Sequence, residues 1–133
     1  MSDGRMLAID RLRHMVEAAS AIEGYTARGR AAFDTDPAIR DAILYQIVVL
    51  GEAAKVVANV DAELAGALSA VEWSLLARMR DHVAHRYWET DHDIVWATAT
   101  KHVPELRKTL STAIDRLGEF RVSLSSAYPP KLL

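Results

Sequence analysis

The spacing of apolar residues constrains the fold most strongly, because it follows helical periodicity along most of the chain. Apolar side chains recur at intervals of two to four residues over residues 5–28, 37–59 and 73–87, and again after Asp91. Neither the alternation typical of β-strands nor an internal repeat is present in the pattern. The sequence therefore predicts an all-α protein, an antiparallel four-helix bundle with short extra helical segments.

Local signals predict where the elements begin and what connects them. Asp36 is a favourable N-cap and Pro37 suits the first helical position, so a helix is expected to begin there. Residues 30–36 predict a turn-rich connector, residues 61–69 a weak helical segment or loop, and residues 89–93 a polar turn.

Glycine and proline residues predict how the long helices pack and end. Gly51, in the middle of the second long helix, costs about 1 kcal/mol relative to alanine, which indicates close packing by another backbone. Pro104 lacks a backbone donor and is expected to break or kink the last helix, and Gly118 is expected to end it. We expect one helical domain over residues 5–120 and a flexible tail over residues 121–133.

Composition narrows the class of protein. The chain has 133 residues, a net charge of −2 and no cysteine, which excludes disulfides, thiol nucleophiles and cysteine-based zinc sites. The first residues lack the apolar run of a signal peptide, and the longest apolar stretch, residues 42–51, is shorter than the roughly 18 residues of a membrane span. We therefore expect a cytoplasmic protein with no membrane partner.

One short segment concentrates positive charge. Residues 78–86 hold three arginines and two histidines, although the chain as a whole is slightly acidic. Arginine binds phosphate through a rigid fork of donors, and histidine transfers protons near neutral pH. The segment therefore suggests a site for an anionic, phosphate-bearing substrate, with contacts to nucleic acid that are local.

The spacing within this segment raises a geometric problem. At about 100° per residue, Arg80 and Tyr87 share a helix face, whereas His85 lies roughly 140° away from Arg80. Either the helix unwinds near His85, or a second copy of the chain completes the site. A symmetric dimer would bring two arginines and two histidines to one cleft, so we predict a homodimer.

Such a cleft suits metal-free RNA cleavage. Histidines can act as the base for the ribose 2′-hydroxyl and as the acid for the leaving oxygen, while arginine stabilises charge on phosphorus. Asp81 could orient a histidine, and Tyr87 could stack on a base or bind phosphate. No carboxylate cluster suits a metal, so neither a metal nor another cofactor is expected.

Simpler interpretations stay open. An arginine-rich helix is commonly a solvated face, with arginines paired to Asp81 or Glu89. A zinc site is a further alternative, built from His82, His85 and either His92 or Asp93. The three tryptophans are interpreted as core or interface anchors rather than stacking platforms: Trp73, Trp88 and Trp96.

Together these segments resemble a known family. Arg80, His85 and Tyr87 match the Arg-x4-His-x-Tyr motif of the HEPN superfamily, in particular its HepT-like toxins. Three flanking blocks resemble the same family: Ile-Val-Val-Leu-Gly-Glu-Ala-Ala-Lys at 47–55, the run 73–80 that leads into the motif, and the two pieces 91–96 and 103–106 that follow it. The resemblance extends over about residues 5–117.

The resemblance implies an all-helical dimer that acts as a metal-independent ribonuclease, the toxin of a toxin–antitoxin pair. It implies that Arg80 and His85 are the catalytic pair. It also implies a partner, a minimal nucleotidyltransferase antitoxin, that silences the toxin by attaching AMP to Tyr87. An AMP group beside the catalytic pair would block RNA and neutralise the arginines.

Asp81 departs from the asparagine that often follows the motif arginine in this family, and its charge could weaken RNA binding. The positive charge of His82 and Arg86 would favour RNA binding and oppose this effect. We expect all three residues to support the catalytic pair or to bind RNA. The alternative function is a non-catalytic helical partner that regulates a nucleotidyltransferase. A purely structural dimer would explain the tryptophans but not the charged segment.

Overall fold

A computed structural model describes the backbone of residues 2–122 and the side chains of residues 2–117. Four long helices make up most of this part of the chain: α1 (Asp3–Thr26), α3 (Pro37–Val60), α5 (Trp73–Arg86) and α7 (Val103–Val122). Short elements connect them: α2 (Arg30–Thr35), α4 (Ala62–Ala67), the 3₁₀ turn η1 (Tyr87–Glu89), α6 (His92–Ala97) and the π-helical η2 (Thr98–His102). Residues 2–122 contain no strand, so the all-α prediction is confirmed.

The predicted start of the second long helix is confirmed. Pro37 is its first residue, and the side chain of Asp36 accepts a hydrogen bond of 3.0 Å from the Ala38 amide. The prediction of a turn-rich connector over residues 30–36 was wrong, because this segment forms α2. The fully buried Phe33 anchors this short helix in the core. Buried backbone N–H and C=O groups have to be hydrogen-bonded, and a helix provides these bonds. The weak segment after α3 is also helical and forms α4, capped by Asp61.

Of the two outcomes predicted for Pro104, a break or a kink, the structure excludes the break, and the helix end predicted at Gly118 was wrong. Pro104 does not break the chain's last helical stretch: α6, η2 and α7 follow one another without a non-helical residue, and the winding changes to π over Thr98–His102. Proline has no backbone N–H to donate, and its ring clashes with the carbonyl group four residues earlier in an α-helix. The wider winding of a π turn accommodates both. Gly118 does not end α7, which continues to Val122. Glycine ends helices by taking a left-handed conformation, and within the described chain only Gly29 has positive φ. The predicted tail beyond Val122 lies outside the described residues.

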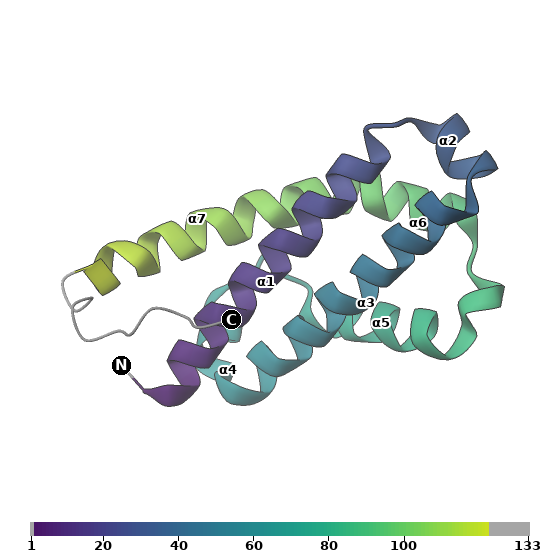
Figure 1. The fold of residues 1–133 in the computed structure, drawn as a ribbon. Helices are drawn as coiled ribbons and strands as arrows, with labels where there is room; N and C mark the ends of the chain where they lie inside the picture. The colour runs from purple at the N-terminus through teal and green to yellow at the C-terminus, as the bar shows by residue number, and fades with distance from the viewer. Residues whose placement is uncertain (1, 123–133) are drawn as a thin grey trace.

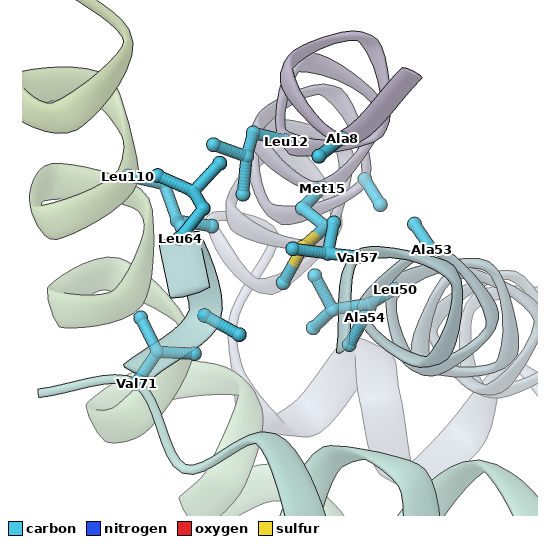
Figure 2. Packing of buried hydrophobic residues seen from close by; sticks show 12 residues of the cluster. Ala8, Leu12, Met15, Leu50, Ala53, Ala54, Val57, Leu64, Val71 and Leu110 are labelled. Atoms are coloured by element: carbon cyan, nitrogen blue, oxygen red, sulfur yellow. The ribbon is translucent and has the colours of Figure 1, made fainter. Parts of the chain in front are cut away.

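The long helices lie side by side in the order α7, α1, α3, α5 (Figure 1). Two clusters of buried side chains form the core. One joins α1, α3, α4 and α7, where residues such as Leu12, Met15, Leu50 and Leu110 interlock (Figure 2). The other joins the C-terminal half of α1 and the N-terminal half of α3 to α2, α5 and α6 around Phe33 and Ile43. Because α3 contributes to both clusters, it is the central scaffold on which α5 is placed.

An open groove separates α5 from the last helical stretch. Its two parts have volumes of about 410 and 400 Å³ and share Ile47, Met79, Ile94 and Thr98 as lining residues. α5 packs closely against α3, whereas it has no comparable contact with α7. The antiparallel four-helix bundle and the dimer therefore stay predictions.

α3 is also the most apolar helix of the chain. By length and composition alone it could cross a membrane, with a mean hydropathy of 1.5 over its most apolar window. Core helices meet the same criterion, and nine α3 residues are buried, a face that packs against α1 and α5. The cytoplasmic location stays a prediction.

Candidate active site

The motif helix α5 is held unusually close to α3 at a single glycine. A Cβ atom added to Gly51 would lie 2.3 Å from the Cβ of Arg80 and 2.7 Å from the carbonyl oxygen of Leu76. Real Cβ atoms do not approach other atoms so closely, so only glycine fits here without a shift. The predicted close packing at Gly51 is confirmed, and its partner is the backbone that carries the candidate catalytic arginine.

Arg80 lies against two carboxylates, one from each helix. Its Nε is 2.9 Å from a carboxylate oxygen of Glu52 on α3, and its Nη1 donates a 3.1 Å hydrogen bond to Asp81. The Nε is buried, and its N–H is not aimed at the Glu52 oxygen, so that contact is an ion pair without a hydrogen bond. About a quarter of the Arg80 side chain stays exposed, which leaves it within reach of a ligand.

Asp81 bridges two cations. The oxygen that accepts the hydrogen bond from Arg80 also lies 3.4 Å from Nζ of Lys55 on α3. The hydrogen bond from Arg80 is the main reason that the pKa of Asp81 lies below its ordinary value; partial desolvation opposes this, and the charge of Lys55 adds to it. Asp81 therefore faces Arg80 and Lys55, and neither histidine is its hydrogen-bond partner in the described structure. The suggestion that Asp81 orients a histidine finds no support in these contacts.

The other end of the motif is open to solvent. His85 and Arg86 form the exposed last turn of α5, and the Tyr87 side chain, at the start of η1, is 44% exposed. The turn is closed by Thr90, whose amide and hydroxyl both donate to the Tyr87 carbonyl oxygen. The helix is regular from Arg80 to His85 and ends at Arg86, where the backbone (φ −135°, ψ 42°) leaves the helical conformation before the 3₁₀ turn that carries Tyr87. The angular offset between Arg80 and His85 is thus real within one chain.

His82 and Arg86 differ in their surroundings. His82 is exposed and lines the groove between α5 and α6, together with Arg78. Arg86 forms a 3.0 Å ion pair with Glu89 and is otherwise largely exposed, which matches the simpler interpretation of a solvated arginine.

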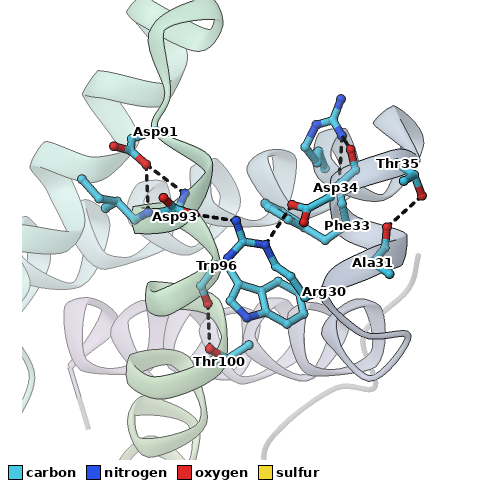
Figure 3. A network of polar contacts seen from close by, with 11 residues as sticks. Arg30, Ala31, Phe33, Asp34, Thr35, Asp91, Asp93, Trp96 and Thr100 are labelled. Carbon is cyan, nitrogen blue, oxygen red and sulfur yellow. Dashed lines mark hydrogen bonds and ion pairs between the residues drawn. The ribbon is translucent and has the colours of Figure 1, made fainter.

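A polar network fixes the chain that follows the motif (Figure 3). Arg30 of α2 donates hydrogen bonds to Asp34 and to Asp93 of α6, which is 63 residues away in the sequence. Its guanidinium lies over the rings of Phe33 and Trp96. Asp91 caps α6 by accepting from the amides of the two residues that follow His92, at 2.8 and 3.3 Å. These contacts hold the segment after Tyr87 against α2.

The histidines do not form a zinc site. Within the described residues, no three histidine or carboxylate side chains lie together in a way that could hold a metal ion. His92, one of the candidate ligands, instead lies edge-on to the ring of Phe33, 5.9 Å between centroids.

The tryptophans divide into two kinds. Trp73 is half-buried and donates a 2.8 Å hydrogen bond to the Ala65 carbonyl, and Trp96 packs against Phe33, so both are core anchors as predicted. Trp88 is 77% exposed, which excludes a core role within this chain. Its role as an interface anchor stays a prediction.

Sequence reasoning did not identify Glu52 and Lys55 as parts of the site. Both lie in the Gly-Glu-Ala-Ala-Lys run of α3, for which packing was the expected role. They occur one and four residues after Gly51, so one helical turn of α3 faces Arg80 and Asp81. A glycine in mid-helix with charged residues beside it was the available signal.

The comparisons with known proteins now define the family. The family described as ribonuclease HepT-like matches residues 15–113, and the chain belongs to this family, part of the HEPN superfamily. The match contains Gly51, Glu52, Lys55 and the whole segment from Arg80 to Tyr87.

Curated relatives agree with this assignment. The chain is 28% identical over 109 residues to a protein of Methanocaldococcus jannaschii named "Gamma-glutamylcyclotransferase and putative RNase", with 81% of this chain and 48% of that protein covered. It is 32% identical over 84 residues to a "Putative RNase" of Caldanaerobacter subterraneus subsp. tengcongensis (63% and 72% covered). It is 28% identical over 99 residues to a "Probable ribonuclease HepT" of Thermococcus cleftensis (74% and 87% covered). The chain thus spans about half of the first relative and most of the other two. No solved structure matches the chain significantly.

Proposed function

We propose that this protein is a metal-independent endoribonuclease that acts as the toxin of a toxin–antitoxin system. The family and its relatives support a ribonuclease-type function. The observation that carries the proposal is that the segment over α5 and η1 holds Arg80, His85 and Tyr87, all at least partly exposed, and that α5 is anchored on α3. A degenerate member would have no need of the complete set.

The functional unit is a homodimer. Because α5 stays regular from Arg80 to His85, these two side chains point roughly 140° apart, and one chain cannot easily direct both at the same phosphate. A two-fold axis beside α5 would pair Arg80 of one copy with His85 of the other. It would also cover apolar side chains that are exposed here, Leu75 and Ile94 among them.

The chemistry follows from these groups. One neutral His85 accepts the proton of the ribose 2′-hydroxyl, the 2′-oxygen forms a bond to phosphorus, and the bond from phosphorus to the 5′-oxygen breaks. The second His85, protonated, gives its proton to the departing 5′-oxygen. Arg80 stabilises the additional negative charge on the phosphoryl oxygens while these bonds change.

Silencing by AMP transfer is part of the proposal. A cognate minimal nucleotidyltransferase would direct the Tyr87 hydroxyl to the α-phosphorus of ATP, forming a phosphodiester and releasing pyrophosphate. The exposure of Tyr87 on a short turn beside His85 supports this, because the acceptor can be reached without unfolding the helix. An attached AMP would cover the exposed end of α5.

Mixing the wild type with an inactive variant tests the shared site. Because cleavage uses the His85 side chains of both copies, refolding the wild type with an equal amount of His85→Ala should leave about a quarter of the activity of the same total amount of wild type, the share of dimers that hold two histidines. Sedimentation checks that dimers form. Half of the activity from dimeric mixtures, or full activity from a monomer, would contradict the shared site.

Two further measurements test the mechanism and its regulation. Cleavage is expected to persist in EDTA; loss of activity that zinc or magnesium restores would contradict the metal-independent mechanism. Intact-mass analysis after incubation with the nucleotidyltransferase and ATP is expected to show added AMP units, with peptide mapping placing them on Tyr87. Tyr87→Phe is the matched control and should gain no mass.

One observation favours a second candidate, a non-catalytic partner that regulates a nucleotidyltransferase. Glu52 and Asp81 both lie against Arg80, so its charge is compensated within the chain. His85→Ala separates the two functions: a regulatory module keeps its activity in this variant, whereas the ribonuclease loses it.

A further inference from the structure

We propose that Glu52 is the positioning residue of Arg80, while Asp81, bound to the same guanidinium, is a competitor that the substrate phosphate displaces. This inference rests on the proposed ribonuclease function and assigns opposite roles to two carboxylates that contact one arginine. It follows from where each carboxylate lies relative to the buried and exposed parts of the Arg80 side chain.

Glu52 contacts the buried part of Arg80. The Nε has no accessible surface and no hydrogen-bond partner, and the Glu52 carboxylate 2.9 Å away is the charge that compensates it. A buried guanidinium nitrogen without such a charge would be strongly disfavoured. Since Nε is shielded by the protein, a phosphate cannot reach it, and the contact with Glu52 persists when a substrate binds.

Gly51 and Glu52 together fix Arg80 at both ends of its side chain. The missing side chain at Gly51 lets the Arg80 Cβ approach α3, and the next residue supplies the charge at Nε. The position of the root of the side chain and that of its charged head are therefore set by two consecutive α3 residues. This preorganisation is what a group that stabilises a transition state needs.

Asp81 contacts Arg80 differently. Its side chain is half-exposed, as that of Glu52 is, but it contacts Nη1 of Arg80 instead of the buried Nε, and the same oxygen is shared with Nζ of Lys55. An ion pair in contact with water is weak, so a phosphate that offers several oxygens can replace it. When it does, Arg80 and Lys55 both face the same anion, and Lys55 becomes a second cation for the substrate.

The test compares matched carboxylate-to-amide variants on the same arginine. Glu52→Gln is expected to lower kcat about 10- to 100-fold with little change in KM, because Arg80 loses its orientation but keeps its charge. Asp81→Asn is expected to tighten RNA binding about two- to fivefold, measured by anisotropy in the cleavage-deficient His85→Ala background. Glu17→Gln, at an exposed glutamate of α1, is the control and should change neither quantity. The proposal is overturned if both variants impair the protein, Glu52→Gln by lowering kcat and Asp81→Asn by weakening RNA binding, or if both improve it.

A readout independent of activity separates positioning from a purely structural role. The Nε–H resonance of Arg80 in an NMR spectrum is identified by its absence in Arg80→Lys. Glu52→Gln is expected to shift this resonance and speed its exchange with water, Glu52→Asp to do so less, and thermal unfolding to change little. An unchanged resonance in Glu52→Gln overturns the positioning role. If the wild-type dimer fails to cleave RNA, the proposed function fails, and the resonance alone decides whether Glu52 positions Arg80.

Discussion

The two ends of the motif, Arg80 in the middle of α5 and His85 in its last turn, differ in how they are held. At the Arg80 end, α5 touches the α3 backbone at Gly51, and the guanidinium contacts charged groups from both helices. At the His85 end, His85 and Arg86 are exposed, and the ion pair of Arg86 with Glu89 lies at the surface. One helix thus carries a group that its own chain orients and another that it leaves free.

This difference indicates what each end still needs. Arg80 is oriented before any ligand arrives, so it can serve a transition state without further ordering. His85 has no comparable support within the described chain, and a second copy or the RNA itself has to fix its ring. The dimer in our proposal is therefore required more by the histidine than by the arginine.

The largest expected effect comes from removing His85. His85→Ala should lower RNA cleavage by about 10²- to 10⁴-fold and leave the thermal midpoint nearly unchanged, because an exposed residue at a helix end makes few contacts. Arg80→Ala should lose cleavage as well, but it should also destabilise the fold, since the removed side chain fills space beside α3 and leaves Glu52 without its partner. Cleavage assays and thermal unfolding of both variants check this. A stable Arg80→Ala and an unstable His85→Ala would reverse the comparison.

The next largest effect is expected at the helix crossing. Gly51→Ala places a methyl group 2.3 Å from the Arg80 Cβ, so the helices have to separate, at a cost of about 1 to 3 kcal/mol in the free energy of unfolding. Gly24→Ala is the matched control: it lies within α1 with nothing within 4 Å of the new atom, and helix propensity should make it neutral or more stable by up to about 1 kcal/mol. Urea unfolding of the two variants measures the contrast.

Activity sharpens the same test. Gly51→Ala should also lower RNA cleavage under conditions in which the variant is folded, because it moves the root of Arg80. A folded Gly51→Ala with wild-type cleavage would show that the close crossing serves packing alone.

The same comparison explains how much of the structure the sequence could predict. Helical spacing and the Asp36–Pro37 start identified α3 and α5 within a few residues, because periodicity and capping are local signals. The errors fell where more than periodicity and capping decides: Phe33 in the core accompanies the helical α2, and the predicted break at Pro104 is absent because the preceding residues wind as the π turn of η2. Gly118, inside a continuous helix, shows that glycine alone does not end one.

The candidate site shows the same division. Arg80, His85 and Tyr87 could be recognised because they lie on one segment with a known spacing. Glu52 and Lys55 lie about 25 residues earlier and enter the site only because α3 and α5 cross at Gly51. The mid-helix glycine predicted that another backbone packs closely there, but not which helix it belongs to. A short-range sequence pattern cannot identify the partner helix.

The smallest expected effect is the acid dependence of the Arg80 end. The pKa of Asp81 is lowered in the folded protein, so the contact with Arg80 stabilises the fold above the carboxyl's ordinary pKa and is lost as pH falls through the lowered one. Asp81→Asn should therefore lower the urea midpoint slightly at neutral pH, the effect being small because solvent screens a half-exposed pair, and should match the wild type once the pH is below the lowered pKa. Glu89→Gln makes the equivalent change at the His85 end, where a surface pair joins neighbouring residues of the same turn. We expect the difference between neutral and acidic midpoints to be smaller in Asp81→Asn than in the wild type, and the loss of midpoint at neutral pH to be larger in Asp81→Asn than in Glu89→Gln. Equal losses at neutral pH in the two variants would mean that the carboxylate beside Arg80 is no more structured than one on the open turn.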